Sequence, residues 1–118
     1  MGRIRWMFAV AASCLVLATG CKKLPPSKPL SELTPQEAAG HEVYQARCAR
    51  CHYANTTRGL NGPGLQALYK QPYMPSGAPA NDERIRSVIV HGRNMMPGYA
   101  DVLNDQQLDN LMAYLHTL

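Results

Sequence analysis

The five residues from Cys48 to His52 constrain this chain more than any other segment, because they carry two thiols and an imidazole in one short stretch. Cys48 and Cys51 are three positions apart, so a helical backbone places both thiols on one face, about one turn apart. Two thiols at that spacing can add to neighbouring vinyl groups of a haem, and the adjacent His52 then lies under the iron. The motif therefore predicts one covalent c-type haem (haem c), with His52 as an axial ligand of its iron.

Three other uses of the two thiols have to be weighed against the haem. A zinc site needs a second CxxC or an HxxxH pair, which the chain lacks, and the adjacency of Cys51 and His52 suits a tetrahedral metal poorly. A thioredoxin-like redox pair belongs with a βαβ pattern, and no alternating strand pattern is present. A disulfide between Cys48 and Cys51 is conceivable in an exported protein. We favour the haem.

The N-terminal residues 1–20 have the pattern of a secretory signal peptide. Arg3 and Arg5 precede an apolar run over residues 6–18. Thirteen residues give about 20 Å of helix, which is short of the ~30 Å hydrocarbon core of a bilayer. A basic start, a short apolar stretch and small residues after it are typical of a signal peptide. The alternative, a short core helix, is disfavoured because both arginines would lie at the wrong end of the helix dipole.

The residues that follow (LATGC, ending at Cys21) resemble the lipobox of bacterial lipoproteins, with Leu17 one position further from the cysteine than is usual. The resemblance implies cleavage before Cys21, its lipidation, and anchoring on the periplasmic side of a bacterial membrane; simple cleavage nearby is the alternative. Three prolines make residues 21–34 a semi-rigid tether. The folded domain is then expected over residues 35–118.

Three helices are expected in that domain, and they predict an all-α fold. Thr34, Pro35 and Glu37 form a capping pattern for a helix that runs to about Arg50. Helices over residues 81–91 and 104–115 have apolar residues at helical spacing and capping residues at their starts. A short turn of helix is plausible over Leu65 to Lys70, within an otherwise loop-rich region.

The small amount of regular structure in the domain indicates that a bound group completes its core. The 118 residues allow one domain, and a net charge of +4 is too small to indicate a nucleic-acid partner. Three helices in about 85 residues bury little surface, and the loops between them add less. A porphyrin would supply the missing apolar core.

The domain resembles the class I (monohaem) cytochromes c over nearly all of residues 36–118. Gly40 and Tyr44 precede Cys48 by eight and four positions, like the glycine and aromatic residue of that family's first helix. Residues 111–115 (LMAYL) resemble its C-terminal helix, whose aromatic residue packs against the glycine. The resemblance implies the small cytochrome c fold, with three main helices and loops wrapped around one covalently bound haem.

The same resemblance implies roles for the loop over residues 61–65 (NGPGL). In the family, a proline carbonyl in this loop accepts the Nδ1–H of the haem-ligating histidine. The carbonyl of Pro63 is therefore expected to orient His52 and to raise its basicity by accepting the Nδ1–H hydrogen bond. Leu65 is expected to pack on the haem.

Met96 is the expected second axial ligand of the iron. In the family, the ligand methionine lies in a loop before the last helix, often followed by proline, and Met96-Pro97 matches that setting. Proline pushes the preceding residue into extended geometry, which helps to project its side chain. Met95 and Met74 are the alternatives among the methionines.

Histidine ligation and arginine contacts are less favoured. His91 ends a helix, where a positive charge is favourable in any case, while His41 and His116 look like surface helix positions. Arg58 and Arg93 are candidates for pairing with the haem propionates, although solvated arginines are the commoner case.

A histidine and a methionine together saturate the iron, which favours a one-electron carrier over an enzyme. Thioether sulfur is a poor donor to ferric iron and raises the reduction potential. We expect membrane-associated redox proteins as partners and contact with the membrane through the lipid. The alternatives are a haem subunit of a larger dehydrogenase or oxidase and, less favoured, a haem enzyme or gas sensor with an open sixth site.

Overall fold

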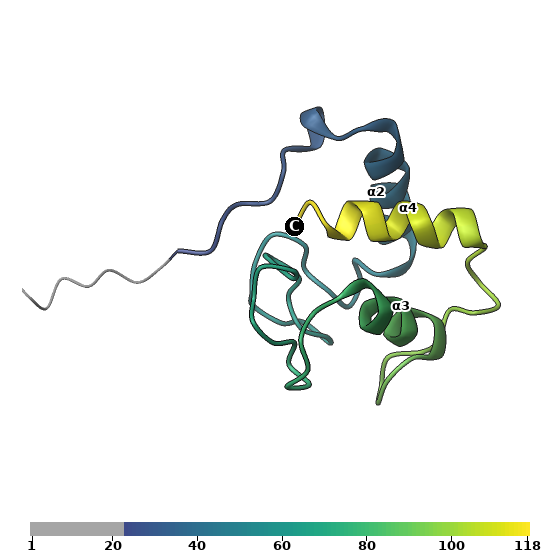
Figure 1. Cartoon of the computed structure of the whole chain (residues 1–118). Helices are drawn as coiled ribbons and strands as arrows, with labels where there is room; N and C mark the ends of the chain where they lie inside the picture. The colour runs from purple at the N-terminus through teal and green to yellow at the C-terminus, as the bar shows by residue number, and fades with distance from the viewer. Residues whose placement is uncertain (1–22) are drawn as a thin grey trace, which may run out of the picture.

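The computed structural model describes residues 23–118, which form an all-α domain as predicted (Figure 1). Extended pairing in these residues is limited to one isolated bridge between Arg93 and Met96. The elements, in chain order, are the 3-10 helix η2 (Leu30–Glu32) and the α-helices α2 (Pro35–Arg47), α3 (Asp82–His91) and α4 (Asp105–Leu115). The predicted signal peptide and Cys21 lie outside the described residues.

Side-chain caps fix where the helices begin. The hydroxyl of Thr34 accepts from the backbone N–H of Glu37, whose carboxylate accepts from Thr34 N–H, and Pro35 occupies the first helical position of α2. Asn104 and Gln107 form the same reciprocal pair at the start of α4. Each pair satisfies two of the backbone N–H groups that a helix start leaves free. The helix starts expected from the sequence are therefore correct.

Two of the expected helical segments differ in the structure. Helix α2 ends at Arg47 rather than Arg50, and Cys48 is its C-terminal cap. Residues 48–52 form turns in which the N–H groups of Cys51 and His52 both donate to the carbonyl of Cys48, each at 3.0 Å. Residues 65–70 form successive turns instead of a helix, because Ala67 has a φ of 55°, which a right-handed helix cannot contain.

Helices α2 and α4 cross in direct contact, and Gly40 makes that contact possible (Figure 1). A Cβ atom at Gly40 would overlap the backbone carbonyl of Asn110 and lie 2.8 Å from the Cβ atom of Tyr114. Tyr44, one turn further along α2, is buried against Tyr114 with ring centroids 5.3 Å apart. The sequence-based pairing of the glycine with the C-terminal helix is thus present in the structure.

The chain before α2 lies against the domain. The carbonyl of Pro25 accepts from Gln66 Nε2 at 3.3 Å, and Lys28 N–H donates to Thr117 O at 2.8 Å. Lys28 Nζ also donates to a Glu37 carboxylate oxygen at 2.7 Å, which holds the pKa of Glu37 below its ordinary value. We call residues 25–33 the strap. The sequence predicts a semi-rigid tether over residues 21–34, and within it the structure shows bonds to the domain from Pro25 onward.

None of the helices in residues 23–118 is long and apolar enough to cross a membrane.

Replacing Gly40 with valine tests the helix crossing. The side chain would push α2 from α4, and we expect the free energy of unfolding to fall by at least about 2 kcal/mol. Ala46→Val introduces the same final side chain at an exposed position of α2 and should cost no more than about 0.7 kcal/mol, through helix propensity. Urea unfolding of the haem-loaded protein measures both. Equal losses would show that the close crossing does not limit stability.

Candidate haem site

An apolar cavity lies between α3, α4 and the loops, and its wall contains the predicted haem-binding residues except Cys51. Helix α3 contributes Ile85, Val88 and Ile89, and α4 contributes Leu111 and Leu115. His52 is the one polar side chain among the lining residues. The loops complete the wall with Cys48, Pro63, Leu65, Leu68, Met74, Pro75 and Met96.

The orientation of His52 is fixed from two sides. Its Nδ1 lies 2.8 Å from the carbonyl oxygen of Pro63, and its own carbonyl accepts from the hydroxyl of the buried Tyr44 at 2.6 Å. A carbonyl oxygen can only accept, so Nδ1 carries the proton and Nε2 of the neutral ring keeps a free lone pair. The ring therefore has the tautomer that a metal ligand requires.

Gly62 allows the loop to lie directly against the imidazole. A Cβ atom at this position would stand 2.8 Å from Nδ1 and from Nε2 of His52. The Gly62 N–H donates to Cys51 O at 2.8 Å, which ties the loop to the CxxCH segment. Gly64 lets the residues around Arg58 cross the same loop, because a side chain there would meet the Arg58 carbonyl 2.6 Å away. The small residues of this loop are thus required by close backbone approach.

The two thiols are free and half-buried. Cys48 lines the apolar cavity, whereas Cys51 lines an adjoining opening together with Cys48 and His52. Burial, with a smaller contribution from Cys51, raises the pKa of the Cys48 thiol to about 11. Before any haem is attached, the Cys48 thiol is therefore protonated at neutral pH, as an apolar surrounding favours. The structure contains neither the disulfide nor, among residues 23–118, a cluster of side chains that would hold zinc.

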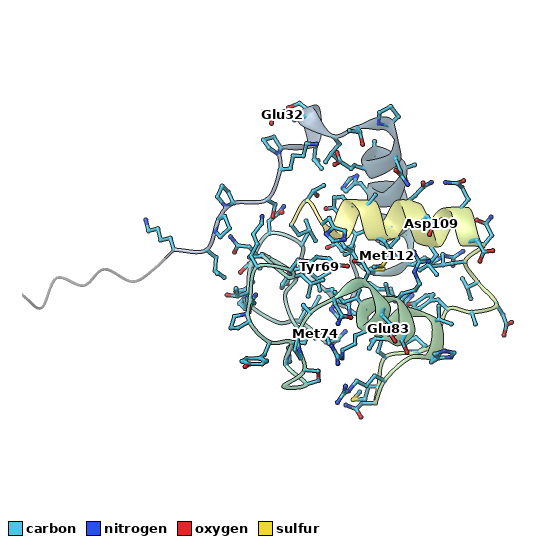
Figure 2. All side chains as sticks on the ribbon, viewed as in Figure 1. Glu32, Tyr69, Met74, Glu83, Asp109 and Met112 are labelled. Atoms are coloured by element: carbon cyan, nitrogen blue, oxygen red, sulfur yellow. The ribbon has the colours of Figure 1, made fainter. Side chains whose placement is uncertain are left out.

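A tight turn over residues 93–96 contains both adjacent methionines and exposes them to different degrees. Arg93 and Met96 exchange backbone hydrogen bonds of 3.0 and 2.9 Å, and Asn94 occupies the left-handed region at φ 53°. Met95 at the tip is 94% exposed, while Met96 is half-buried and lines the cavity. Met74, on the loop before α3, lines the cavity as well, whereas Met112 lies in the core on α4 (Figure 2).

The other candidate residues lie away from the cavity wall or at its rim. His91 is exposed, and His116 pairs with Asp82 at 2.8 Å. His41 is half-buried against Tyr114, with centroids 5.1 Å apart, so it is not the surface residue that the sequence indicated. None of the three lines the cavity. Arg58 lies over the Tyr53 ring, and Arg93 lines a second opening beside Met96.

The residues around the cavity fit a covalently bound haem. The wall is hydrocarbon and thioether except for one imidazole, two thiols stand at its edge, and the imidazole nitrogen left free is the one that can bind iron. This donor set matches histidine-ligated haem attached through a CxxCH motif. Fold and site together define a small all-α protein of the c-type haem class.

Comparison with known proteins shows the family. The family described as cytochrome c oxidase, cbb3-type, subunit III matches residues 18–115. Cytochrome c6 of Bryopsis maxima is 31% identical over 64% of this chain and 84% of its own length. The crystal structure of cytochrome c6 from the diatom Phaeodactylum tricornutum is 27% identical, with a TM-score of 0.50, over 67% of this chain and 88% of that one.

A further relative is much longer. Dihydro-heme d1 dehydrogenase of Pseudomonas aeruginosa is 37% identical over 68% of this chain, but the match spans only 15% of that protein.

The chain belongs to the cytochrome c family. Its cofactor is the covalent c-type haem that the sequence predicted, and its fold and function are those of a cytochrome c6-like electron carrier. The lipoprotein form and the identity of the axial ligands remain predictions.

Sequence reasoning missed three contacts of the site. The hydroxyl bond from Tyr44 to the His52 carbonyl links residues eight apart, and no pattern in the chain indicates it. Leu68 lines the cavity from a segment expected to be helical. The sequence predicts Gly62 only as a member of the loop over residues 61–65, and the imidazole packed against it shows why a glycine is needed there.

The substitution Gly62→Ala should disturb His52 directly. The added methyl group overlaps the imidazole, so we expect unfolding to become easier by about 1–3 kcal/mol and the haem absorption spectrum to change. Leu60→Ala, in the same loop at a half-exposed position, is the matched control and should leave the spectrum as it is. An unaltered spectrum in both variants would contradict the role given to Gly62.

Proposed function

We propose that this cytochrome is a one-electron carrier whose haem iron is ligated by His52 and Met96, and that lipidated Cys21 holds it at the periplasmic side of a bacterial membrane. The observation that carries the ligand assignment is that His52, with Nε2 free, and Met96 line the same apolar cavity. Met95, its neighbour, points into solvent.

The proposed ligands explain why a carrier is favoured over an enzyme. The haem, when bound, supplies a one-electron change of its iron between two oxidation states. His52 and Met96 would occupy both axial positions, so no position is left for a substrate. The apolar wall excludes water and disfavours the additional charge of the oxidised state, and the thioether acts in the same direction.

The turn over residues 93–96 supports Met96 over Met95. The paired backbone bonds of Arg93 and Met96 fix the turn, and Met95 at its tip is 94% exposed whereas Met96 lines the cavity. Met74 is held equally well, by two backbone hydrogen bonds of 2.8 Å within its own loop, so backbone order does not distinguish it from Met96. Met96 is favoured over Met74 because it lies in the loop between α3 and the last helix, where the ligand methionine of the family is expected.

Replacement of Met96 by alanine tests the ligand assignment. We expect the weak methionine-to-iron charge-transfer band of the ferric protein to vanish, carbon monoxide to bind the reduced form, and the potential to fall by a sizeable part of the ~0.8 V range that axial ligands span. Absorption spectra and a redox titration measure the three effects.

Met95→Ala and Met74→Ala are the matched controls, and both should keep the charge-transfer band. Loss of the band in Met74→Ala alone would transfer the ligand role to Met74. A wild-type protein that lacks the band and binds carbon monoxide readily would contradict the carrier and favour a haem enzyme or gas sensor.

The lipid anchor rests on the sequence around Cys21, which resembles a lipobox after a signal-like run. We expect mass spectrometry of the mature protein to find an acylated N-terminal Cys21, and Cys21→Ser to release the protein from the membrane fraction, since multiple acyl chains are needed for stable anchoring. An unmodified N-terminus at another residue in wild-type protein would contradict the anchor.

A second candidate function is that of a haem subunit in a larger oxidoreductase. Two observations favour it: the matched family is described as an oxidase subunit, and the dehydrogenase from Pseudomonas aeruginosa contains a segment similar to this chain. In both cases the haem would still carry electrons. Purification from detergent-solubilised membranes at native abundance separates the two, because a subunit elutes with its complex and a free carrier elutes alone.

A further inference from the structure

The strap brings the chain into contact with the domain at Pro25, only four residues after Cys21. Its first contact is the bond from Gln66 Nε2 to the Pro25 carbonyl, and its second is the bond from Lys28 N–H to Thr117 O. The Lys28–Glu37 ion pair, with both side chains partly shielded from solvent, fixes the strap to the start of α2. Three contacts on three different segments hold the strap in one position.

The reach of the chain decides whether the domain can turn at a membrane. A free tether from Cys21 to residue 34 spans up to about 45 Å when extended, more than the width of roughly 30 Å of a domain of this size. With the strap in place, Cys21 can lie no further from Pro25 than the reach of four residue steps, which is about 14 Å. An anchor at Cys21 would then hold the nearby face close to the lipid.

The opening beside the two thiols is lined by residues other than those that bond to the strap. They include Arg47 at the end of α2, Tyr99, and Met95, which is the most exposed large apolar side chain of the described residues. The strap instead bonds to Gln66, Thr117 and Glu37. Figure 1 shows the loop after α3 far from the point where the strap leaves the domain.

We propose that the strap fixes the orientation of the anchored domain, with the opening around Met95 directed away from the membrane. The redox partner is then a protein domain that approaches from the aqueous side, and not one buried in the bilayer. This inference rests on the proposed lipidation of Cys21. It requires no new contact, because the strap bonds already restrict the anchor.

Cysteine labelling on vesicles tests the orientation. The lipidated, haem-loaded variants Asn55→Cys, at an exposed position that shares an opening with Leu30 of the strap, and Met95→Cys are bound to phosphatidylcholine–phosphatidylglycerol vesicles and treated with a bulky, water-soluble maleimide. The reference is each variant made without lipid, as Cys21→Ser behind an ordinary secretory leader. Rates of modification are compared between the two forms.

Position 55 should be modified at least about fivefold more slowly on vesicles, because the strap holds this side of the domain within about 14 Å of the anchor, while position 95 should react at its reference rate. Inserting twelve Gly/Ser residues between Lys23 and Leu24 should abolish the protection at position 55. Protection of Met95→Cys equal to that of Asn55→Cys, or protection that survives the insertion, would overturn the orientation. Failure of the wild-type protein to float with vesicles would instead contradict the lipid anchor itself.

Discussion

The close crossing of α2 and α4 at Gly40 is the contact on which the rest of this structure depends. Because no side chain separates the two helices there, the backbone of α4 lies against α2. Helix α2 then ends where its next residue, Cys48, reaches the cavity edge, and α4 presents Leu111 and Leu115 to the same space. One residue without a side chain thus determines the distance between the attachment motif and the cavity wall.

The helices alone do not close a core. Tyr44, Leu111, Tyr114 and Leu118 are packed between α2 and α4, yet the surface that α3 turns toward α4 is only partly covered by protein. A domain of this size has little buried surface to spare. A haem bound here would fill this space and form part of the core, so binding it would contribute directly to the stability of the fold.

The long loop between Cys51 and α3 is ordered by backbone contacts instead of regular structure. Gly62 N–H bonds to Cys51 O, Leu65 N–H bonds to Tyr53 O, and the Pro63 carbonyl accepts from His52. Each of these bonds needs a close approach, which is why glycine recurs in this loop. A segment that looks irregular in sequence therefore has a defined task, which is to hold the imidazole in one tautomer and one orientation.

The sequence by itself determined the chemistry and the helices. The CxxCH motif predicts the haem because two thiols at that spacing can add to its vinyl groups and leave the histidine beside the iron. Capping residues such as Thr34 and Asn104 specify helix starts because they bond to neighbours three positions away. Such signals are local. The tertiary structure alone decided what depends on distant residues: that Tyr44 bonds to the His52 carbonyl, that Met96 lines the cavity while Met95 is 94% exposed, and that the strap from Pro25 bonds to Gln66 and Thr117. Those contacts join residues that are far apart along the chain, so a local sequence pattern cannot predict them.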